Sequence, residues 1–322
     1  MTRLRLIGLG GTIAFTDSST GAVPSLSAGD LPFSPETGDE ISVVDVANIS
    51  SIGIGQAHLA QLVAEIEKAV KERYEGVVVS HGTDTMEESV YLAALTLERS
   101  QVPIAFTGAM RHHGSRGSDG AANLADAFAV ARRGARAGLL GPCVVMNGEV
   151  HSARFVAKRH TVRLNAFESP DAGPVGCINE GRASIWFTPA YIDYVGPCPR
   201  GEWPDVELVT MVTALNPARL RPWLARKPDG VVMAGFGGGH AHTVILELID
   251  ELIAGGVCVV AASRCGAGDT LRSTYGVPGT EIDLQERGVL MAGALSPPKA
   301  RLRLQVALAN GVAPPSVFPF GD

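Results

Sequence analysis

The sequence predicts an α/β protein with a doubly wound, mostly parallel sheet. Short apolar runs alternate with amphipathic stretches along the 322 residues, and several of these runs are continuous rather than alternating. Continuous apolar strands are typical of parallel sheets that helices cover on both faces. Many of the 38 glycines directly follow such a run, which indicates strand-to-loop junctions.

The expected elements follow from this alternation. The helices show apolar residues at helical spacing, as in Leu59, Leu62, Val63, Ile66 and Val70, with charged residues opposite. Strands are expected at Leu4–Leu9, Gly76–Ser80, Pro103–Thr107, Cys143–Asn147, Gly230–Ala234, Val257–Ser263 and Gly288–Gly293. Helices are expected at Leu59–Val70, Met86–Glu98, Ala121–Arg133, Thr243–Ile253 and Pro298–Ala309. The polar segment Phe15–Glu40 is expected to be a long functional or disordered loop.

A stretch rich in proline and glycine, residues 188–206, interrupts the alternation and is expected to be an interdomain linker. We therefore expect an N-terminal catalytic domain at residues 1–187. A smaller C-terminal α/β domain is expected at residues 207–322.

Charge and cysteine content exclude several classes of protein. The net charge of −6 offers no basic surface for nucleic acid, and no run of 18 apolar residues suggests a membrane span. The first strand is expected at the start of the chain, without a secretory leader. The five cysteines are scattered and odd in number, which argues against disulfides and a zinc site. A cytoplasmic protein is expected.

The first candidate site segment is Gly8-Leu9-Gly10-Gly11-Thr12, where the first strand ends. A dinucleotide-binding fingerprint needs a third glycine at position 13, which is isoleucine here, so this interpretation fails. The glycines still predict a tight turn that exposes the Thr12 hydroxyl at the carboxyl end of a strand, where open α/β sheets bind ligands. A structural turn with Thr12 as a helix cap explains the segment equally well.

The second segment, His81–Glu88, follows another apolar run and reads as strand end, glycine turn and helix start. Asp84 can cap the helix, and Thr85 with Glu88 has the spacing of a capping box. Capping does not require so many polar side chains, however. Thr83, a second hydroxyl beside a carboxylate, is therefore a candidate for activating a nucleophile or water.

The third segment is Thr107–Arg111, whose small residues let backbone groups approach a ligand closely. Ser118 or Asp119 is expected to cap the helix that follows. His112 and His113 have no carboxylate or cysteine at ligand spacing, so a surface loop is favoured over a metal site. Together, the three segments place two hydroxyls, a carboxylate and several backbone turns at one sheet edge, which indicates acyl transfer through a hydroxyl nucleophile.

These segments resemble the two signature regions and the substrate loop of the bacterial-type L-asparaginases, in the same order and spacing. The octapeptide His81–Glu88 is highly specific, and the similarity covers nearly the whole chain. It rests on Gly10–Ala14, His81–Glu88, Gly108–Arg111, Arg154–Lys158, Ala234–Gly239 and Pro297–Arg301.

The resemblance implies a larger flavodoxin-like N-terminal domain, a smaller C-terminal α/β domain, and a homodimer or homotetramer with its active site at the subunit interface. It implies an amidohydrolase that acts on the side-chain amide of L-asparagine, or of a related or derivatised asparagine, and releases ammonia or an amine without metal or cofactor. Thr12 is the implied nucleophile, and Thr83, Asp84 and Lys158 form the implied second catalytic cluster. The implied substrate-binding residues are Ser51, Gly82, Ala109, His240 and Glu281.

The chain departs from the family pattern at three places. No tyrosine precedes Tyr74, although the family carries one in the loop after the nucleophile. Ser51 is followed by Ile52, Gly53 and Ile54, whereas the family has glutamine and aspartate after this serine. Gly238 and His240 occupy positions at which the family often has asparagine. We therefore expect recognition of the amino-acid end of the substrate to be retuned.

Two alternatives to a hydrolase arise from the same residues. One is a non-catalytic or regulatory relative that binds an asparagine-like ligand. Retention of Thr12, Thr83, Asp84 and Lys158 argues against it, because a pure binder needs neither hydroxyl. The other is a protein that passes ammonia to a partner as part of an amidotransferase, for which an extra N-terminal partner-binding domain is expected ahead of the first strand.

Overall fold

The computed structural model describes residues 2–33, 38–98, 102–133, 141–190 and 193–318. The chain divides into two compact units, residues 1–194 and 195–322, and this division falls within the stretch 188–206. Each unit contains its own sheet, which is mostly parallel in the N-terminal unit and parallel in the C-terminal unit. No helix in the described part of the chain is both long and apolar enough to cross a membrane.

The N-terminal unit is built on an eight-stranded sheet with the order β12-β11-β8-β7-β6-β5-β1-β4. Five neighbouring strands are parallel: β1 (Thr2–Gly10), β4 (Asp39–Ile49), β5 (Gly76–Ser80), β6 (Ile104–Thr107) and β7 (Pro142–Met146). Counted along the chain, these five strands have the spatial order 2-1-3-4-5. This is the flavodoxin-like order, and it confirms the predicted class, with the topological switch point between β1 and β5.

Three antiparallel strands extend this sheet: β8 (Glu149–Ser152), β11 (Gly176–Asn179) and β12 (Arg182–Ile185). Helices α1 (Gln56–Lys71), α2 (Met86–Thr96) and α3 (Gly120–Ala131) connect the parallel strands. Leu124 and Phe128 of α3 pack in one core cluster with Leu4, Leu6 and Val78 of the sheet. The central strands are largely apolar because helices cover both faces of the sheet.

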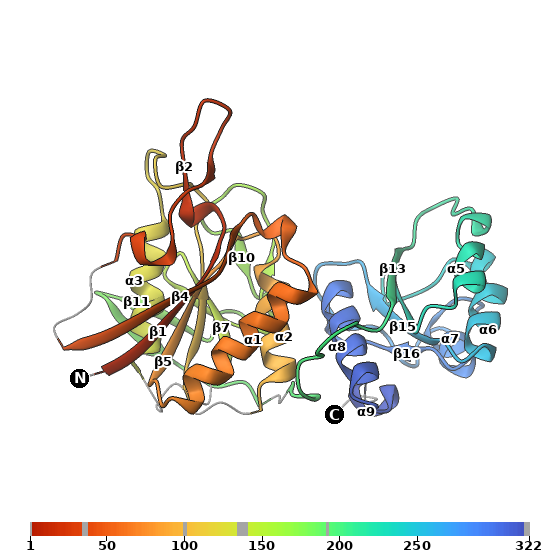
Figure 1. Ribbon diagram of the computed structural model, residues 1–322. Helices are drawn as coiled ribbons and strands as arrows, with labels where there is room; N and C mark the ends of the chain where they lie inside the picture. The colour runs from red at the N-terminus through yellow and green to blue at the C-terminus, as the bar shows by residue number, and fades with distance from the viewer. Residues whose placement is uncertain (1, 34–37, 99–101, 134–140, 191–192, 319–322) are drawn as a thin grey trace. The chain divides into compact units, whose positions relative to one another are not determined.

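The N-terminal unit also contains short elements outside its main sheet. Two small hairpins pair β2 (Phe15–Thr16) with β3 (Val23–Pro24) and β9 (Ala157–Lys158) with β10 (Phe167–Glu168). The 3₁₀ turns are η1 (Thr12–Ala14), η2 (Ala28–Asp30) and η3 (Ser51–Gly53). Figure 1 shows the β2–β3 hairpin projecting from the N-terminal unit beyond the end of β1.

The C-terminal unit has a four-stranded parallel sheet in sequential order: β13 (Val206–Thr210), β14 (Gly230–Gly235), β15 (Cys258–Ser263) and β16 (Leu290–Met291). Its core includes Met233, Val259, Ile249 and Leu284. The helical elements are η4 (Pro217–Arg219), α5 (Arg221–Arg226), η5 (Thr243–Ile245), α6 (Leu246–Ala254), α7 (Glu281–Glu286), α8 (Pro297–Ala309) and α9 (Pro314–Val317).

Several strands were not predicted. The largest, β4, has eleven residues with mostly intermediate or exposed side chains, because it is the edge strand of its sheet. Its sequence mixes polar and apolar residues and therefore lacks the continuous run used to find the central strands. The segment 15–40 is also more ordered than predicted, since it contains β2, β3 and η2. The expected strand at 288–293 is reduced to the two residues of β16.

Candidate active site

The carboxyl ends of the central strands lie level with one another. Gly8 of β1 pairs with Ser80 of β5, and Ser80 pairs with Thr107 of β6. The loops after these three strands therefore leave the sheet at the same edge. This edge includes the switch point between β1 and β5, where α/β sheets of this order bind their ligands.

Two glycines bring the first two loops into direct backbone contact. A Cβ on Gly11 would lie 2.3 Å from both Cα and N of Gly82, so no side chain fits there. Gly11 also has φ +81°, which an L-residue adopts only with strain. A Cβ on Gly82 would in turn lie 2.6 Å from the Oγ of Ser51. The loops that carry Thr12, Thr83 and Ser51 are thus packed together.

Thr12 is half-buried and begins η1, while Gly11 takes the N-cap position. The capping interpretation of Thr12 is therefore wrong, because its backbone is already inside the turn. Within the described residues, its hydroxyl has no hydrogen-bond partner. An unpartnered hydroxyl at a ligand-binding sheet edge is available to react with a bound substrate.

Thr83, Asp84 and Lys158 form a connected cluster. The Lys158 ammonium donates to Thr83 Oγ1 at 2.8 Å and to Asp84 Oδ1 at 2.6 Å. Thr83 is 5% exposed, whereas the side chain of Asp84 is 57% exposed, so the carboxylate faces solvent and the hydroxyl does not. Burial alone disfavours a negative charge on the Thr83 hydroxyl, but the adjacent ammonium of Lys158 favours it, which makes this hydroxyl a candidate for deprotonation.

The backbone of Lys158 is held from the neighbouring helix. The Lys158 N–H donates to Glu87 Oε2 at 2.7 Å, which ties β9 to the first turn of α2. Glu87 was part of the octapeptide recognised in the sequence, yet its role was not predicted. Local patterns assign an acidic residue in a first helical turn to the helix dipole, and they contain no information about a strand 71 residues away.

Ser51 is also tied to this cluster. Its Oγ accepts from the Asp84 N–H at 3.3 Å, and its carbonyl accepts from Thr85 Oγ1 at 3.1 Å. The capping box expected of Thr85 and the cap expected of Asp84 are therefore wrong, because both side chains are used in the site. The next residue, Ile52, carries a large apolar side chain on η3 that is 78% exposed.

His81 has a structural environment. It is fully buried, its Nδ1 lies 2.7 Å from the Gly82 carbonyl, and its Nε2 lies 2.8 Å from Ser89 Oγ. A carbonyl only accepts, so the proton is on Nδ1, and Nε2 accepts from the serine. Burial lowers the pKa of His81 to about 4, although the hydrogen bond to Gly82 opposes this shift. The two hydrogen bonds of the neutral ring stabilise the turn that contains Thr83.

The loop after β6 completes this edge. Ala109 is fully buried, and a Cβ on Gly108 would lie 2.4 Å from the His81 carbonyl, so this loop also packs closely on the turn that carries Thr83. Asp119 occupies the N-cap position of α3, but its carboxylate makes no capping bond. It accepts instead from the N–H groups of Met110 and Arg111. The expectation that it caps the helix is thus wrong.

The histidine pair of this loop shows no metal geometry. Nε2 of His112 lies 3.6 Å from Asp17 Oδ1 in the loop of the β2–β3 hairpin, and His113 is exposed. No cluster of three or more potential metal ligands occurs among the described residues.

His240 and Glu281 contact each other within the C-terminal unit. His240 Nε2 lies 2.9 Å from Glu281 Oε2, while the N–H groups of Thr274 and Tyr275 donate to Oε1 at 2.6 Å. Burial alone would raise the pKa of Glu281, but these backbone bonds and the histidine lower it below its usual value. The Tyr275 ring packs edge-on against His240 with 5.7 Å between centroids. His240 follows the carboxyl end of β14 and is part of a defined polar cluster.

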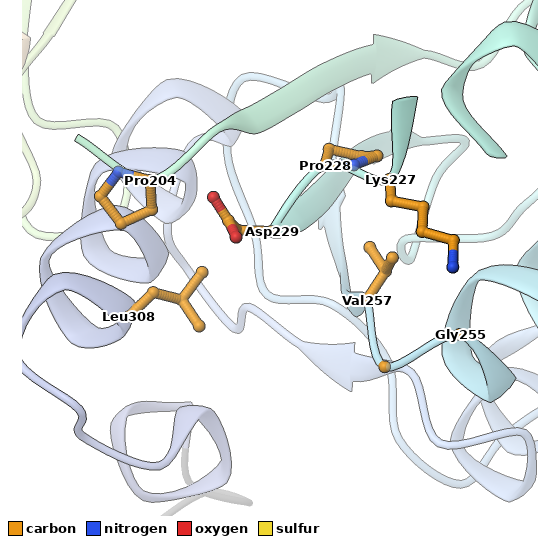
Figure 2. A pocket seen from close by; sticks show the side chains of 8 residues that line it. Pro204, Lys227, Pro228, Asp229, Gly255, Val257 and Leu308 are labelled. Carbon is orange, nitrogen blue, oxygen red and sulfur yellow. The ribbon is translucent and has the colours of Figure 1, made fainter. Parts of the chain in front are cut away.

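A pocket of about 370 Å³ lies elsewhere in the same unit. Figure 2 shows its lining, which includes Asp229 and Val257, the residues directly before β14 and β15. It therefore opens at the amino ends of these strands, whereas His240 follows the carboxyl end of β14. The pocket is separate from the predicted site residues of this unit.

Comparisons with known proteins cover almost the whole chain. Residues 3–190 match the family model of the asparaginase N-terminal domain, and residues 205–317 match that of the glutaminase/asparaginase C-terminal domain. A probable L-asparaginase from Deinococcus radiodurans is 35% identical over 321 residues, which span 97% of this chain and 95% of that protein. A component of the glutamyl-tRNA(Gln) amidotransferase from Haloquadratum walsbyi is 33% identical over 326 residues, which span 95% of this chain and 71% of that protein.

A structural comparison agrees with these sequence matches. The crystal structure of a probable cytoplasmic L-asparaginase from Campylobacter jejuni superimposes with a TM-score of 0.84 and 29% identity, and the match covers 98% of each chain.

Proposed function

The chain belongs to the asparaginase family and is an L-asparaginase-like amidohydrolase, and we propose that it cleaves the side-chain amide of L-asparagine or of a derivatised asparagine through Thr12. The observation that carries this proposal is the cluster in which Lys158 bonds both Thr83 and Asp84. The Gly11–Gly82 contact joins the Thr12 loop to this cluster. A family relative that only binds its ligand has no use for a second, lysine-linked hydroxyl.

The proposed reaction has two steps. In the first, Thr12 Oγ forms an ester bond to the amide carbon, the C–N bond breaks, and the nitrogen leaves as ammonia or an amine after taking up a proton. In the second, water adds to the ester carbon, and the Thr12 hydroxyl is released with the acid. Thr83, Asp84 and Lys158 are proposed to relay the proton and stabilise the developing charge. Backbone N–H groups near Thr83 and Ala109 are proposed to hold the oxyanion.

Substrate recognition is proposed to involve two sets of residues. Ser51, Gly82 and Ala109 line the edge that carries Thr12, and the bonds of Ser51 to the Asp84 loop support its inclusion. His240 and Glu281 supply a polar cluster from the C-terminal unit. The exposed side chain of Ile52 supports acceptance of asparagines that carry an apolar substituent, because free asparagine offers nothing apolar to contact there.

A second candidate function is that of a non-catalytic relative that binds an asparagine-like ligand. The observation that favours it is that the Thr12 hydroxyl has no hydrogen-bond partner among the described residues. In that case the bound ligand itself supplies the hydrogen bond that the hydroxyl lacks. The retained contacts of Lys158 support the hydrolase over this alternative.

Assembly and location are also proposals. We propose a homodimer or homotetramer in which the active site is completed at the subunit interface, and light scattering of the purified protein at micromolar concentration tests it. A cytoplasmic location is supported by the name of the C. jejuni neighbour, and cell fractionation tests it.

An amide screen tests the proposed activity. Steady-state release of ammonia or amine would be measured for L-Asn, L-Gln, D-Asn, β-aspartyl amides and N-substituted asparagines, with wild type and Thr12→Ala. Release by the wild type and its loss in Thr12→Ala are expected. Release from none of the amides would refute the hydrolase, and a much higher kcat/KM for free L-Asn than for every derivative would refute the retuned recognition.

A further inference from the structure

The backbone of Ala109 has no hydrogen-bond partner among the described residues, which is unusual for a buried residue. The residue is fully buried, yet neither its N–H nor its C=O bonds to any group in the described part of the chain. Buried backbone groups are nearly always paired, because an unpaired one loses its contacts with water without compensation. The two groups of Ala109 lie in the loop that packs against the His81–Thr83 turn through Gly108. A bound ligand is the natural partner for them.

The residues that follow Ala109 are fixed by one carboxylate. Asp119 is 9% exposed, and its two oxygens lie 3.1 and 3.0 Å from the Met110 N–H. Oδ1 also accepts from the Arg111 N–H at 2.9 Å. A carboxylate that accepts from two successive backbone amides imposes one orientation on both peptide groups.

The residue that precedes Ala109 is fixed by a side-chain amide. Asn123 is 2% exposed, and its Nδ2 donates to the Gly108 carbonyl at 3.0 Å and to Asp119 Oδ2 at 2.9 Å. Its Oδ1 accepts from the Asn147 N–H at 3.0 Å, which connects the network to the end of β7. Asp119 and Asn123 lie four residues apart on one face of the first turn of α3.

We propose that Asp119 and Asn123 are positioning residues for amide hydrolysis. They hold the peptide groups on either side of Ala109 so that its N–H and C=O remain open to the substrate amide. This inference rests on the proposed function and adds to it two residues that do not themselves contact the substrate. The network meets the needs of a preorganised site, in which donors are fixed before charge develops in the transition state.

Replacement of the carboxylate tests the proposal. In Asp119→Asn the side chain keeps its size, but it loses one acceptor and turns an NH₂ group toward other donors. A misplacement of about 1 Å is enough to cost on the order of 10²-fold in rate. We expect kcat for the best amide to fall by about that factor, with KM changed by less than about threefold, because the lost contact forms mainly in the transition state.

The matched control is Asp39→Asn. Only 6% of the Asp39 side chain is exposed, and its Oδ2 accepts from Arg132 Nε at 2.6 Å, but Asp39 begins β4 at the opposite edge of the sheet. A purely structural role of Asp119 would lower the thermal midpoint of both variants and leave kcat per folded enzyme equal. The two variants are therefore compared at the same folded fraction.

If Asp119→Asn does not fold, a second variant tests the same proposal. Asn123→Asp keeps the acceptor for Asn147 but removes the donors to Gly108 and Asp119, and the new carboxyl faces the Asp119 carboxylate, which raises its pKa. Protonation of the new carboxyl restores one donor, so its kcat relative to wild type should rise as the pH falls from about 8 to about 5.5. A structural role gives no such recovery of kcat.

The possible outcomes distinguish failure of the positioning role from failure of the proposed function. An active wild type whose kcat is unchanged in Asp119→Asn, or whose Asn123→Asp variant shows no recovery, overturns the positioning role and leaves the hydrolase intact. A wild type that releases nitrogen from no amide refutes the proposed function, and the positioning role falls with it.

Discussion

The contact between Gly11 and Gly82 makes the strongest single prediction about how the site is built. A Cβ at position 11 would lie 2.3 Å from two backbone atoms of Gly82, whereas ordinary contacts begin at 3.4 Å. Gly11→Ala therefore has to separate the two loops by about 1 Å, which is on the order of the misplacement that costs 10²-fold in rate. The residue also has φ +81° and ψ −179°, a backbone conformation that is essentially restricted to glycine and costs an alanine about 1–3 kcal/mol of strain.

The two costs can be separated with a matched variant. Gly181 has φ +72° in the turn between β11 and β12, and an added Cβ there would meet no atom within 4 Å. Gly181→Ala should thus lose about 1–2 kcal/mol of unfolding free energy from strain alone and keep its activity. Gly11→Ala should lose about 2–6 kcal/mol, because forced backbone displacement adds about 1–3 kcal/mol to its larger strain of about 1–3 kcal/mol.

Urea unfolding and the rate of ammonia release measure both quantities. Each rate is normalised to the folded fraction, so that loss of stability is not counted as loss of catalysis. We expect kcat of Gly11→Ala to fall by about 10²-fold while that of Gly181→Ala stays within about twofold of wild type. Equal stability and equal kcat in the two variants would refute the claim that this contact sets the distance between the hydroxyls.

Three further predictions concern single side chains. Lys158→Met should lower kcat by about 10²–10⁴-fold because it removes the proton-relaying cation, while the exposed control Lys68→Met keeps wild-type ammonia release. Because burial lowers the pKa of His81 to about 4, the unfolded state takes up a proton as the pH falls from about 6.5 to about 4 and the folded state does not. The free energy of unfolding should therefore fall by about 3 kcal/mol as the pH is lowered through this window. In urea unfolding, the free energy of unfolding of His81→Gln should depend less on pH than that of the wild type. Glu281→Gln should lower the unfolding free energy by about 1–3 kcal/mol in urea, since the amide cannot replace both carboxylate acceptors; an unchanged midpoint would contradict the charged cluster.

The central fold could be predicted from the sequence because its strands are covered on both faces. Continuous apolar runs such as Gly76–Ser80 have few other stable placements in a globular protein. The edge strand β4 and the short strand β13 carry mixed polar and apolar residues, so their sequences do not differ from those of loops. Strand pairing across long separations, which places β4 beside β1, is not encoded in any local pattern.

The sequence predicted the parts of the candidate site in which several polar side chains lie in one short segment. Thr83 and Asp84 stood out because helix capping leaves their number unexplained, and Lys158 was added by family resemblance. The structure brings these three together, while their roles in catalysis stay predictions. Asp119, Asn123 and Glu87 were missed as site residues, because each fits an ordinary helix start and its partner lies in another loop. The one feature that distinguishes Asp119 is that its carboxylate does not cap the helix, and this feature is visible in the structure but not in the sequence.

The most direct test of the account is the identity of the residue that becomes acylated. Enzyme mixed with the most slowly hydrolysed amide would be quenched in acid within the first turnovers, digested, and analysed by peptide mass spectrometry. We predict an aspartyl-type ester on the peptide that contains Thr12 and its absence in Thr12→Ala. An ester on Thr83, or full turnover with Thr12 replaced by alanine, would contradict the assignment of Thr12 as the nucleophile.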